Sequence, residues 1–514
     1  MTKDIYYSNN KRIAKNTIVL TIRMIIVLIV NLFTTTIVIS SLGVVDFGIY
    51  SVVGGLVTMF TFLNVSMSTC IQRFFNFELG KNGNDGARRV YITSLQIDVL
   101  LGLIIVILTE TIGLWYLNSH MVLPSERMSI AQVIFQLSVL SLLLNIFQVP
   151  YVAAIVAHEQ LNFYALISLT DVFLKFLIAI SMKYMPGDHL LIYGVLMVIV
   201  VLFDFIAYYT YAHVKFKEIR LMRFYDKKLF KSMFVFSSWN IFGTFAAMMK
   251  EQGINMVINL FFGPVVNAAR GISYQVMGGL NGFAGNVSMT TRPQIIKSYA
   301  QGDLERTIWL FFLSSKLCFM AIFIFALPII VEMNYILTLW LNENVPKFTG
   351  IFTFWILITA FISNLNGPTS GVVHATGKMK KYQLVNSIVS LSVVPLSYWA
   401  YKQGAPPETS FVIVFVITAL CQLLSIIILR SLIVFSVGQY MKDVIISLFL
   451  VVVVSFIFTL IPHLFLSEGF VRLIVVTCTA VIAEVAAFTT LALNKKERNT
   501  MLQFVREKIH SRRG

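Results

Sequence analysis

The stretch NVSMSTCIQRFFNFELG at residues 64–80 returns as NVSMTTRPQIIKSYAQG at residues 286–302. With one constant offset, Asn, Val, Ser, Met, Thr, Gln and Gly recur in register, ending at Gly80 and Gly302. Each copy follows an apolar, glycine-rich segment and ends in a polar loop. The pattern predicts an internal duplication, in which two halves of the chain carry the same helix in the same orientation.

The composition indicates an integral membrane protein. Hydrophobic residues make up 57% and charged residues 12% of the 514 residues, and this charged fraction is about half that of an ordinary soluble domain. Many apolar runs exceed the roughly 20 residues that cross a hydrocarbon core of about 30 Å. The four cysteines lie in or beside these runs without metal-type spacing, so we interpret them as core residues. No cleavable signal peptide is expected, because the first apolar run is long and no small-residue cleavage site closes it.

The apolar runs predict an all-α membrane protein with about fourteen spans. Their approximate ranges are 17–40, 47–71, 91–117, 129–155, 164–185, 190–213, 232–260, 265–291, 307–331, 350–372, 383–401, 410–430, 443–466 and 471–493. An even number of spans leaves both termini on one side of the membrane. Lys and Arg crowd the N-terminus, the segment 214–231 and the tail 494–514, so the positive-inside rule predicts that all three are cytoplasmic.

The formal net charge of +16 follows from this topology. Cytoplasmic loops rich in Lys and Arg meet anionic lipid headgroups, so membrane lipids are the expected partners and no nucleic acid is needed to explain the charge. The tail from Lys495 to Arg513 is predicted to lie on the membrane surface as a basic helix. Its apolar face would hold Leu502, Val505 and Ile509.

The duplication also predicts the domain organisation. Residues 1–213 form one six-helix bundle and residues 232–433 the other, joined by the basic cytoplasmic linker 214–231. Residues 434–493 hold two accessory helices, and the basic tail 494–514 follows. Because six is even, the halves have parallel topology, and the cleft between them is the predicted substrate path. One chain contains both halves, so we expect a monomer.

The sequence offers no sign of an enzyme. No loop exceeds about twenty residues, which is too short for a separate catalytic domain. Ser/His/Asp sets, paired carboxylates and metal-ligand constellations are missing, and the seven histidines are scattered. We therefore expect neither catalytic residues nor a metal or cofactor.

Five cations inside predicted spans are the informative residues, because a charge that faces lipid is costly and each should face protein or water. They are Arg23, Lys175, Lys250, Arg270 and Lys316. Arg23 lies about 9 Å into the first span at 1.5 Å per residue, so it either snorkels to the headgroups or contacts a ligand. Arg270 stands near the outer end of its span, where its planar guanidinium suits a phosphate.

For Lys250 and Lys316, two interpretations each remain. Lys250 precedes Glu251, and the two interrupt a span near Gly253, either as an ion pair at a broken helix or as part of the path. Lys316 has no acid nearby in sequence, so ligand contact and pairing across helices are equally open.

Lys175 follows Asp171 by four residues, so the two share a helical face and can form an ion pair. A structural pair is the simpler interpretation. A pair that opens when Asp171 is protonated would couple transport to an ion gradient. Further acids lie within predicted spans, namely Asp98, Glu110, Asp204 and Glu484.

Three stretches carry a resemblance to a known family. They are LGVVDFGIYSVVGGLVTMFTFLNVSMSTCIQRFFNFELG (42–80), FFGPVVNAARGISYQV (261–276) and PQIIKSYAQGD (293–303). Together with the span count they resemble the Wzx-type flippases of lipid-linked oligosaccharides, in the multidrug/oligosaccharidyl-lipid/polysaccharide (MOP) superfamily. The likeness covers nearly all of the chain, and it is a pattern of apolar sequence rather than a catalytic signature.

This resemblance implies a V-shaped pair of six-helix bundles that alternates between inward-open and outward-open states. It implies translocation of an undecaprenyl-pyrophosphate-linked oligosaccharide, a repeat unit of O-antigen, capsule or exopolysaccharide, across the bacterial inner membrane. A proton or sodium gradient or the membrane potential would drive it, and a polysaccharide polymerase or glycosyltransferases would be possible partners. Related flippases line the cavity with cations, which makes Arg23 and Arg270 substrate-binding candidates, with Lys250 and Lys316 outside any matched motif.

A MATE-type multidrug or cation antiporter is the alternative within the same superfamily. Such proteins commonly use intramembrane carboxylates to bind cationic drugs and to drive ions. Here the first span, 17–40, contains Arg23 and no Asp or Glu, which favours an anionic ligand. Asp98, Asp171 and Asp204 keep the alternative open. A non-transporting membrane component of polysaccharide assembly has no positive feature in the sequence.

Overall fold

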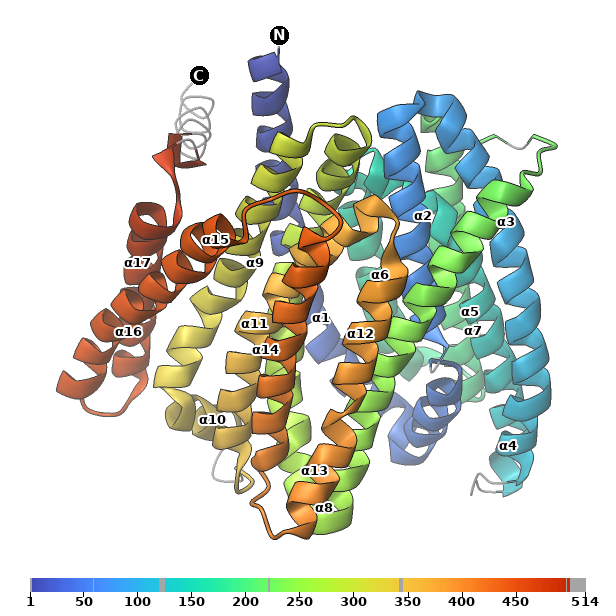
Figure 1. Ribbon diagram of the computed structural model, residues 1–514. Coiled ribbons are helices and arrows are strands. Elements are labelled where there is room, and N and C mark those ends of the chain that lie inside the picture. The colour runs from blue at the N-terminus through green and yellow to red at the C-terminus, as the bar shows by residue number, and fades with distance from the viewer. Residues whose placement is uncertain are drawn as a thin grey trace, which may run out of the picture. The chain divides into compact units, whose positions relative to one another are not determined.

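The computed structural model describes residues 2–58, 60–119, 125–220, 222–341, 345–495 and 497–499. All regular structure in these ranges is helical, and no β-strand occurs in them (Figure 1). The predicted all-α fold class is therefore confirmed.

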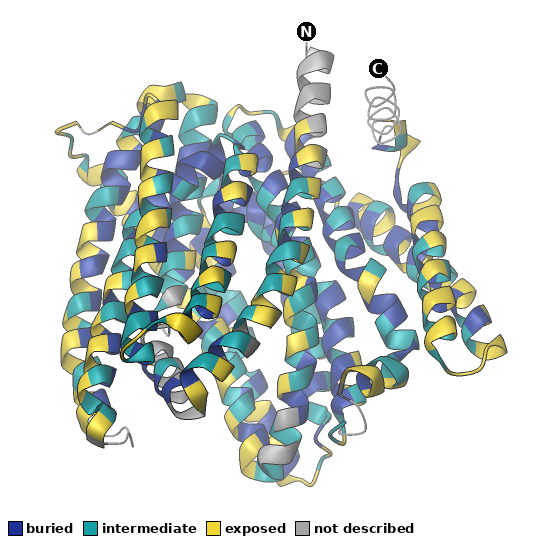
Figure 2. Cartoon of the chain, turned by 180° about the vertical axis from the view of Figure 1, so that it is seen from behind, coloured by how far each residue is buried: buried dark blue, intermediate teal, exposed yellow. Residues whose placement is uncertain are grey.

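Ten helical segments of the described chain are long and apolar enough to cross a membrane. They are Gly83–Ser119, Met128–Ala157, Leu161–Tyr184, His189–Lys215, Leu304–Val331, Thr349–Thr376, Met379–Lys402, Thr409–Arg430, Val437–Phe465 and Phe470–Ala492. Buried and exposed positions share the same helices in Figure 2, so a helix has one face toward its neighbours and another facing outward. Many outward positions are large and apolar, as at Phe449, Ile457 and Ile482, which suits contact with lipid. The chain is a multi-pass membrane protein.

The count of fourteen spans stays a prediction. The predicted spans beyond the ten fall in α1 (Thr2–Thr58), α2 (Thr61–Lys81) and α8 (Lys227–Ala300). α1 and α8 each continue through a single non-helical glycine, Gly43 with φ 80° and ψ 163° and Gly263 with φ 75° and ψ −174°. Only glycine adopts this backbone region readily. The same break between the first two spans of each half supports the duplication.

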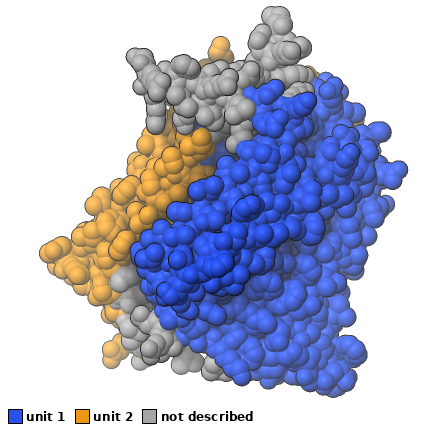
Figure 3. Space-filling view, turned by 90° about the vertical axis from the view of Figure 1, so that its left-hand side faces the viewer, with its two compact units in different colours: residues 1–17, 245–514 blue, residues 18–244 orange. Residues whose placement is uncertain are grey.

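The chain divides into two compact units, coloured separately in Figure 3. Unit 2 comprises Ile18–Thr244 and unit 1 comprises Met1–Thr17 with Phe245–Gly514. Within unit 2 the helices are α2, α3 (Gly83–Leu108), α4 (Leu114–Ser119), α5 (Met128–Ala157), α6 (Leu161–Ser181) and α7 (His189–Lys215), with parts of α1 and α8. α5 packs against α2, α3 and α7, and α6 packs against α7. A core that includes Ile105, Phe135 and Leu142 fills the space between them.

Unit 1 repeats this packing. Its helices are α9 (Leu304–Val331), α10 (Met333–Leu341), α11 (Thr349–Thr376), α12 (Met379–Leu391), α13 (Val393–Lys402), α14 (Thr409–Arg430), α15 (Val437–Tyr440), α16 (Ser447–Phe465) and α17 (Phe470–Ala487), with the rest of α8. α11 packs against α9 and α14, as α5 does against α3 and α7, and α12 packs on α14 as α6 does on α7. The accessory helices α16 and α17 lie side by side and contact α9 (Figure 1).

α1 and α8 each begin in one unit and end in the other. In unit 1, the hydroxyl of Thr17 lies 3.0 Å from that of Thr290, which belongs to the repeated stretch. In unit 2, the hydroxyl of Thr244 lies 2.8 Å from that of Ser66, which belongs to the other copy. The start of each half therefore packs on the repeated helix of the other half.

Candidate functional site

Arg23 of α1 points into the protein. Its Nε donates a hydrogen bond to Ser168 Oγ of α6 at 2.7 Å, and its guanidinium carbon lies 5.1 Å from the centre of the Tyr164 ring. Both partners are neutral, and the described residues supply no carboxylate that forms an ion pair with it. Of the two interpretations left by the sequence, snorkelling to the headgroups does not describe this half-buried side chain.

Lys175 and Asp171 form the ion pair that their spacing allows, with Nζ 2.7 Å from Oδ1 across one turn of α6. Asp204 of α7 lies near the same pair, and one of its carboxyl oxygens is buried without a hydrogen-bond partner in the described chain. Asp171, Lys175 and Asp204, all in unit 2, form what we call the unit 2 charged cluster. Tyr208 of α7 lies near Asp204, Asp171 and Arg23.

Arg270 lies in a second group of charges, within unit 1. Its Nη2 donates to Glu251 at 3.2 Å from Oε2 and 3.1 Å from the backbone oxygen, and its Nη1 donates to Asn255 Oδ1 at 3.3 Å. Its guanidinium also stacks 4.3 Å from the centre of the Tyr274 ring. Lys250 Nζ lies 3.2 Å from the other oxygen of Glu251. One carboxylate thus serves two cations, and the group keeps a net positive charge.

The predicted interruption of the helix near Gly253 is wrong, because α8 is helical there and breaks only at Gly263. A Cβ at Gly253 would lie 2.7 Å from the Val394 side chain, so this glycine permits close packing against α13. Gly263 precedes Pro264, and the residue before a proline is driven out of the helical region. The Lys250–Glu251 pair therefore lies on an unbroken helix.

Lys316 of α9 pairs across a long sequence distance. Its Nζ lies 2.9 Å from Glu497 Oε2, and both side chains are only 2% exposed. Glu497 also accepts a hydrogen bond from the Asn494 amide, and Asn494 Oδ1 accepts one from the Glu497 amide, so the two residues cap each other in the manner of a capping box. Of the two roles left open for Lys316, the structure shows the pairing. The proposed lipid contacts Leu502, Val505 and Ile509 lie outside the described residues.

Arg292 is a candidate that sequence reasoning missed, because the eighth span was predicted to end at residue 291. α8 continues to Ala300, and half-buried Arg292 lies close to Cys318 of α9 and Tyr382 of α12. Among the described residues none forms a hydrogen bond or ion pair with its guanidinium. The repeat held the missing signal, since Arg292 occupies the register position of Cys70, which is fully buried.

Two further acidic residues are fully buried in the protein. Asp98 of α3 and Glu484 of α17 are both 0% exposed, and no described group hydrogen-bonds to their carboxyl oxygens. Asp98 lies near Cys70 and Tyr151 within unit 2. Burying a carboxyl group without hydrogen-bond partners is costly.

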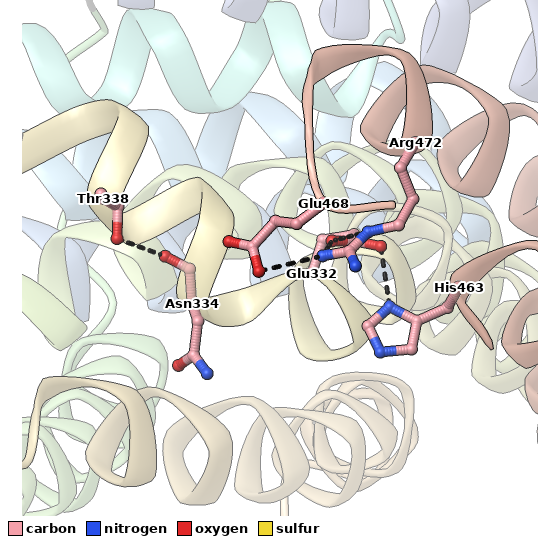
Figure 4. A network of polar contacts seen from close by, with 6 residues as sticks. All are labelled: Glu332, Asn334, Thr338, His463, Glu468 and Arg472. Atoms are coloured by element: carbon pink, nitrogen blue, oxygen red, sulfur yellow. Dashed lines mark hydrogen bonds and ion pairs between the residues drawn. The ribbon is translucent and has the colours of Figure 1, made fainter. Parts of the chain in front are cut away.

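A network around Glu332 attaches the accessory helices to unit 1 (Figure 4). Glu332, at the end of α9, accepts hydrogen bonds from Arg472 of α17 at 2.8 and 3.1 Å. Its other oxygen lies 2.8 Å from His463 Nδ1 of α16. Glu468, in the loop between those helices, lies 3.8 Å from Arg472 and is largely exposed. One buried carboxylate thus holds both accessory helices.

No known protein-family model and no curated protein matches the sequence. Solved structures do match the fold. A point mutant of a MATE transporter is 12% identical, with the alignment covering 81% of this chain and 95% of that chain at a TM-score of 0.71. The outward-facing conformation of a multidrug resistance MATE family transporter of the MOP superfamily is 13% identical, with 82% and 96% covered and a TM-score of 0.70.

A MOP superfamily transporter from Pyrococcus furiosus is also similar, at 13% identity, with 81% and 95% covered and a TM-score of 0.67. Its structure is described as having a binding pocket of reverse polarity that suggests a different function. The chain therefore has the fold of MATE and MOP superfamily transporters. At these identities the likeness shows the fold alone.

Proposed function

We propose that the protein is a flippase that moves an undecaprenyl-pyrophosphate-linked oligosaccharide across the bacterial inner membrane by alternating access. The sugar is a repeat unit of O-antigen, capsule or exopolysaccharide. Both termini face the cytoplasm in this proposal, one chain is the working unit, and membrane lipids are its surroundings. A polysaccharide polymerase or glycosyltransferases are the proteins that would hand over or accept the substrate.

The observation that carries the proposal is the environment of Arg23. A guanidinium inside a membrane bundle needs a counter-charge, and its two contacts, Ser168 and Tyr164, are neutral. A substrate phosphate supplies that charge, and the planar guanidinium can give it two hydrogen bonds at once. The net positive group of Arg270, Lys250 and Glu251 points to the same kind of ligand. Lys316 has a weaker claim, since its ammonium already has Glu497.

The unit 2 charged cluster is the proposed coupling site. Asp171 forms an ion pair with Lys175, and protonation of Asp171 would open that pair. Gain or loss of that proton changes the charge beside Arg23, and therefore the attraction for an anionic headgroup. Coupling to a proton gradient follows from this arrangement, and a sodium ion or the membrane potential would act on the same carboxyls.

Deletion of the gene tests the proposal, in a strain from which any second flippase has been removed. We expect loss of surface polysaccharide and accumulation of the lipid-linked precursor on the cytoplasmic leaflet, measured by extraction and by accessibility to a membrane-impermeant sugar-modifying reagent. Complementation with Arg23→Lys should restore part of the export and Arg23→Glu none, at equal amounts of folded protein. Normal surface polysaccharide in the deletion strain would reject the flippase.

A MATE-type multidrug or cation antiporter is the second candidate, favoured by the two adjacent carboxyls of Asp171 and Asp204. Asp171 is compensated by Lys175 and Asp98 is fully buried, whereas Arg23 is half-buried without an acid partner in the described chain. Increased sensitivity of the deletion strain to cationic drugs, with normal surface polysaccharide, would favour this candidate.

A further inference from the structure

The polar groups around Arg292 are occupied with one another. Tyr382 donates to Asn366 Oδ1 at 2.6 Å, and the hydroxyl of Ser288 lies 3.4 Å from Cys318 Sγ. A guanidinium has five N–H donors and stays protonated in proteins. In the part of unit 1 that the structure describes, those donors find no acceptor.

Three other cations inside the helices of unit 1 have a counter-charge. Arg270 and Lys250 share Glu251, and Lys316 holds Glu497. A charge inside a membrane bundle is costly unless it faces a partner or water. Arg292 thus lacks the counter-charge that its neighbours in the same unit possess, which is the condition for a bound anion.

The repeat shows that the fold itself does not need this arginine. Its register counterpart, Cys70, is a small core residue that is fully buried in unit 2. Two copies of one helix therefore carry a core side chain in one unit and an unpaired cation in the other. Packing explains the cysteine, whereas packing alone gives no reason for the guanidinium.

The position of Arg292 indicates where its ligand enters. It lies eight residues before the end of α8 at Ala300, or about 12 Å at 1.5 Å per residue. Tyr382 lies in the first turn of α12, which begins at Met379. In the proposed orientation both positions are near the cytoplasmic end of unit 1, at the depth of phospholipid headgroups.

We propose that Arg292 is the cation of an oxyanion-binding subsite at the cytoplasmic end of unit 1. The ligand is a phosphate group, because a guanidinium fork can bind two of its oxygens at once. On the proposed function, this group is the pyrophosphate of the lipid-linked oligosaccharide arriving from the cytoplasmic leaflet. Free phosphate or pyrophosphate presents the same oxyanion chemistry.

Thermal unfolding of the purified full-length protein in neutral detergent tests the subsite, with inorganic pyrophosphate titrated at constant ionic strength. We expect the wild-type midpoint to rise saturably. Arg292→Met should unfold no lower than the wild type without the anion, because it removes an uncompensated charge. The apparent dissociation constant of Arg292→Met for pyrophosphate should be at least tenfold higher than that of the wild type. Arg292→Lys keeps the charge and loses the guanidinium fork, so its dissociation constant should lie between those of the wild type and Arg292→Met.

Arg472→Met is the matched control, since Arg472 is compensated by Glu332. It should unfold at a lower temperature and keep the pyrophosphate response. A wild-type midpoint that pyrophosphate does not raise, or an Arg292→Met protein that still responds fully, would overturn the subsite. So would an Arg292→Met protein that loses as much stability without anion as Arg472→Met.

Undecaprenyl pyrophosphate as competitor identifies the source of the phosphate. Competition at concentrations below those of inorganic pyrophosphate supports the lipid substrate, and failure to compete assigns the subsite to free phosphate. This test is separate from the flippase test. Normal surface polysaccharide in the deletion strain, with pyrophosphate binding that depends on Arg292, would reject the flippase and keep the subsite.

Discussion

His158 and Glu218 join two loops of unit 2. The His158 ring stacks on Phe216 with centroids 4.2 Å apart, and its Nε2 is hydrogen-bonded to Glu218 Oε1. Burial alone would raise the pKa of Glu218, but the hydrogen bond and the charge of His158 outweigh it and hold the pKa below its ordinary value of 4.5. The loop near His158, which lacks basic residues, is thus fastened by this contact to the linker before α8.

The pH dependence of stability should report this contact. Because the pKa of Glu218 is lower in the folded protein, its contribution is present above pH 4.5 and is lost as the pH falls through the folded value. Glu218→Gln should lower the free energy of unfolding at neutral pH by about 1.5–3 kcal/mol. Thermal unfolding of both proteins from pH 7 to pH 3 should show the difference shrinking toward the acid end, and a constant difference would contradict the assignment.

Removal of the charge at Asp171 should uncouple transport from the proton gradient. Asp171→Asn leaves Lys175 without its carboxylate and removes the group whose protonation would open the pair. We expect flipping in proteoliposomes to lose its dependence on pH. Lys175→Arg, which keeps an ion pair one helical turn away, serves as the control that retains it. Unchanged coupling in the asparagine variant would return Asp171 to a structural role.

Charge partners that are close in sequence could be predicted, and distant ones could not. Lys175 with Asp171 and Lys250 with Glu251 follow from helical spacing or adjacency. Glu497 is 181 residues from Lys316, and Glu332 is 140 residues from Arg472. Only the folded chain brings such pairs together. Arg292 was missed for a different reason, namely a span boundary placed one residue too early.

At the scale of helices, the breaks at Gly43 and Gly263 should be sensitive to any side chain. Nothing lies within 4 Å of a Cβ built at either position, so the cost is backbone strain rather than a clash. We expect Gly43→Ala and Gly263→Ala each to lower the free energy of unfolding by about 1–3 kcal/mol. Gly271→Ala, in helical backbone with equally open space, should leave stability unchanged or raise it by about 0.4–1 kcal/mol. Equal effects in all three variants would show that these breaks are not strained.

The attachment of α16 and α17 should depend on Glu332. Glu332→Gln removes the charge that Arg472 and His463 share in a fully buried position, at a cost of about 3 kcal/mol or more. Hydrogen exchange should quicken in α16 and α17 and stay unchanged in unit 2. Glu468→Gln, on an exposed side chain 3.8 Å from the same arginine, should have an effect below about 1 kcal/mol. Equal exchange in the two variants would argue against Glu332 as the attachment point.

Helical class, the repeat and the approximate spans could be predicted, because apolar runs of membrane length are visible in composition. Hydropathy could not place the break in α8. The charges of Lys250 and Glu251 suggested a break beside them, but the non-helical residue is Gly263, which precedes a proline. The Gly263-Pro264 dipeptide was the available signal. Gly43 has no proline after it, and only its structure shows the corresponding break.

For the whole molecule, the exchange of chain between units has a consequence for fragments. Residues 1–221 lack the start of α8 that completes unit 2, and residues 222–514 lack the first 17 residues, which belong to unit 1. Each fragment expressed alone should be degraded or aggregate, whereas co-expression should restore a complex that co-purifies and unfolds near the intact protein. Independent folding of either fragment with native stability would show that the exchanged segments are dispensable.

At the scale of the whole molecule, the roles of the charged residues could be predicted only in part. The sequence places cations inside predicted spans of both halves, and the proposed substrate follows from that excess. The sequence does not show that residues 1–17 belong to unit 1 or that residues up to Thr244 belong to unit 2, because hydropathy carries no information on which helices pack together.

The first residues of α1 and α8, which each belong to the unit formed mainly by the other half, have a consequence for how a duplicated chain could arise. A gene encoding a single half would have produced a protein whose first residues had no repeated helix to pack on except that of a second identical copy. Two such copies would have exchanged these segments, as the protomers of a domain-swapped homodimer do. In a single chain that carries both copies the two can differ, as they do at the register position held by Cys70 in one copy and Arg292 in the other.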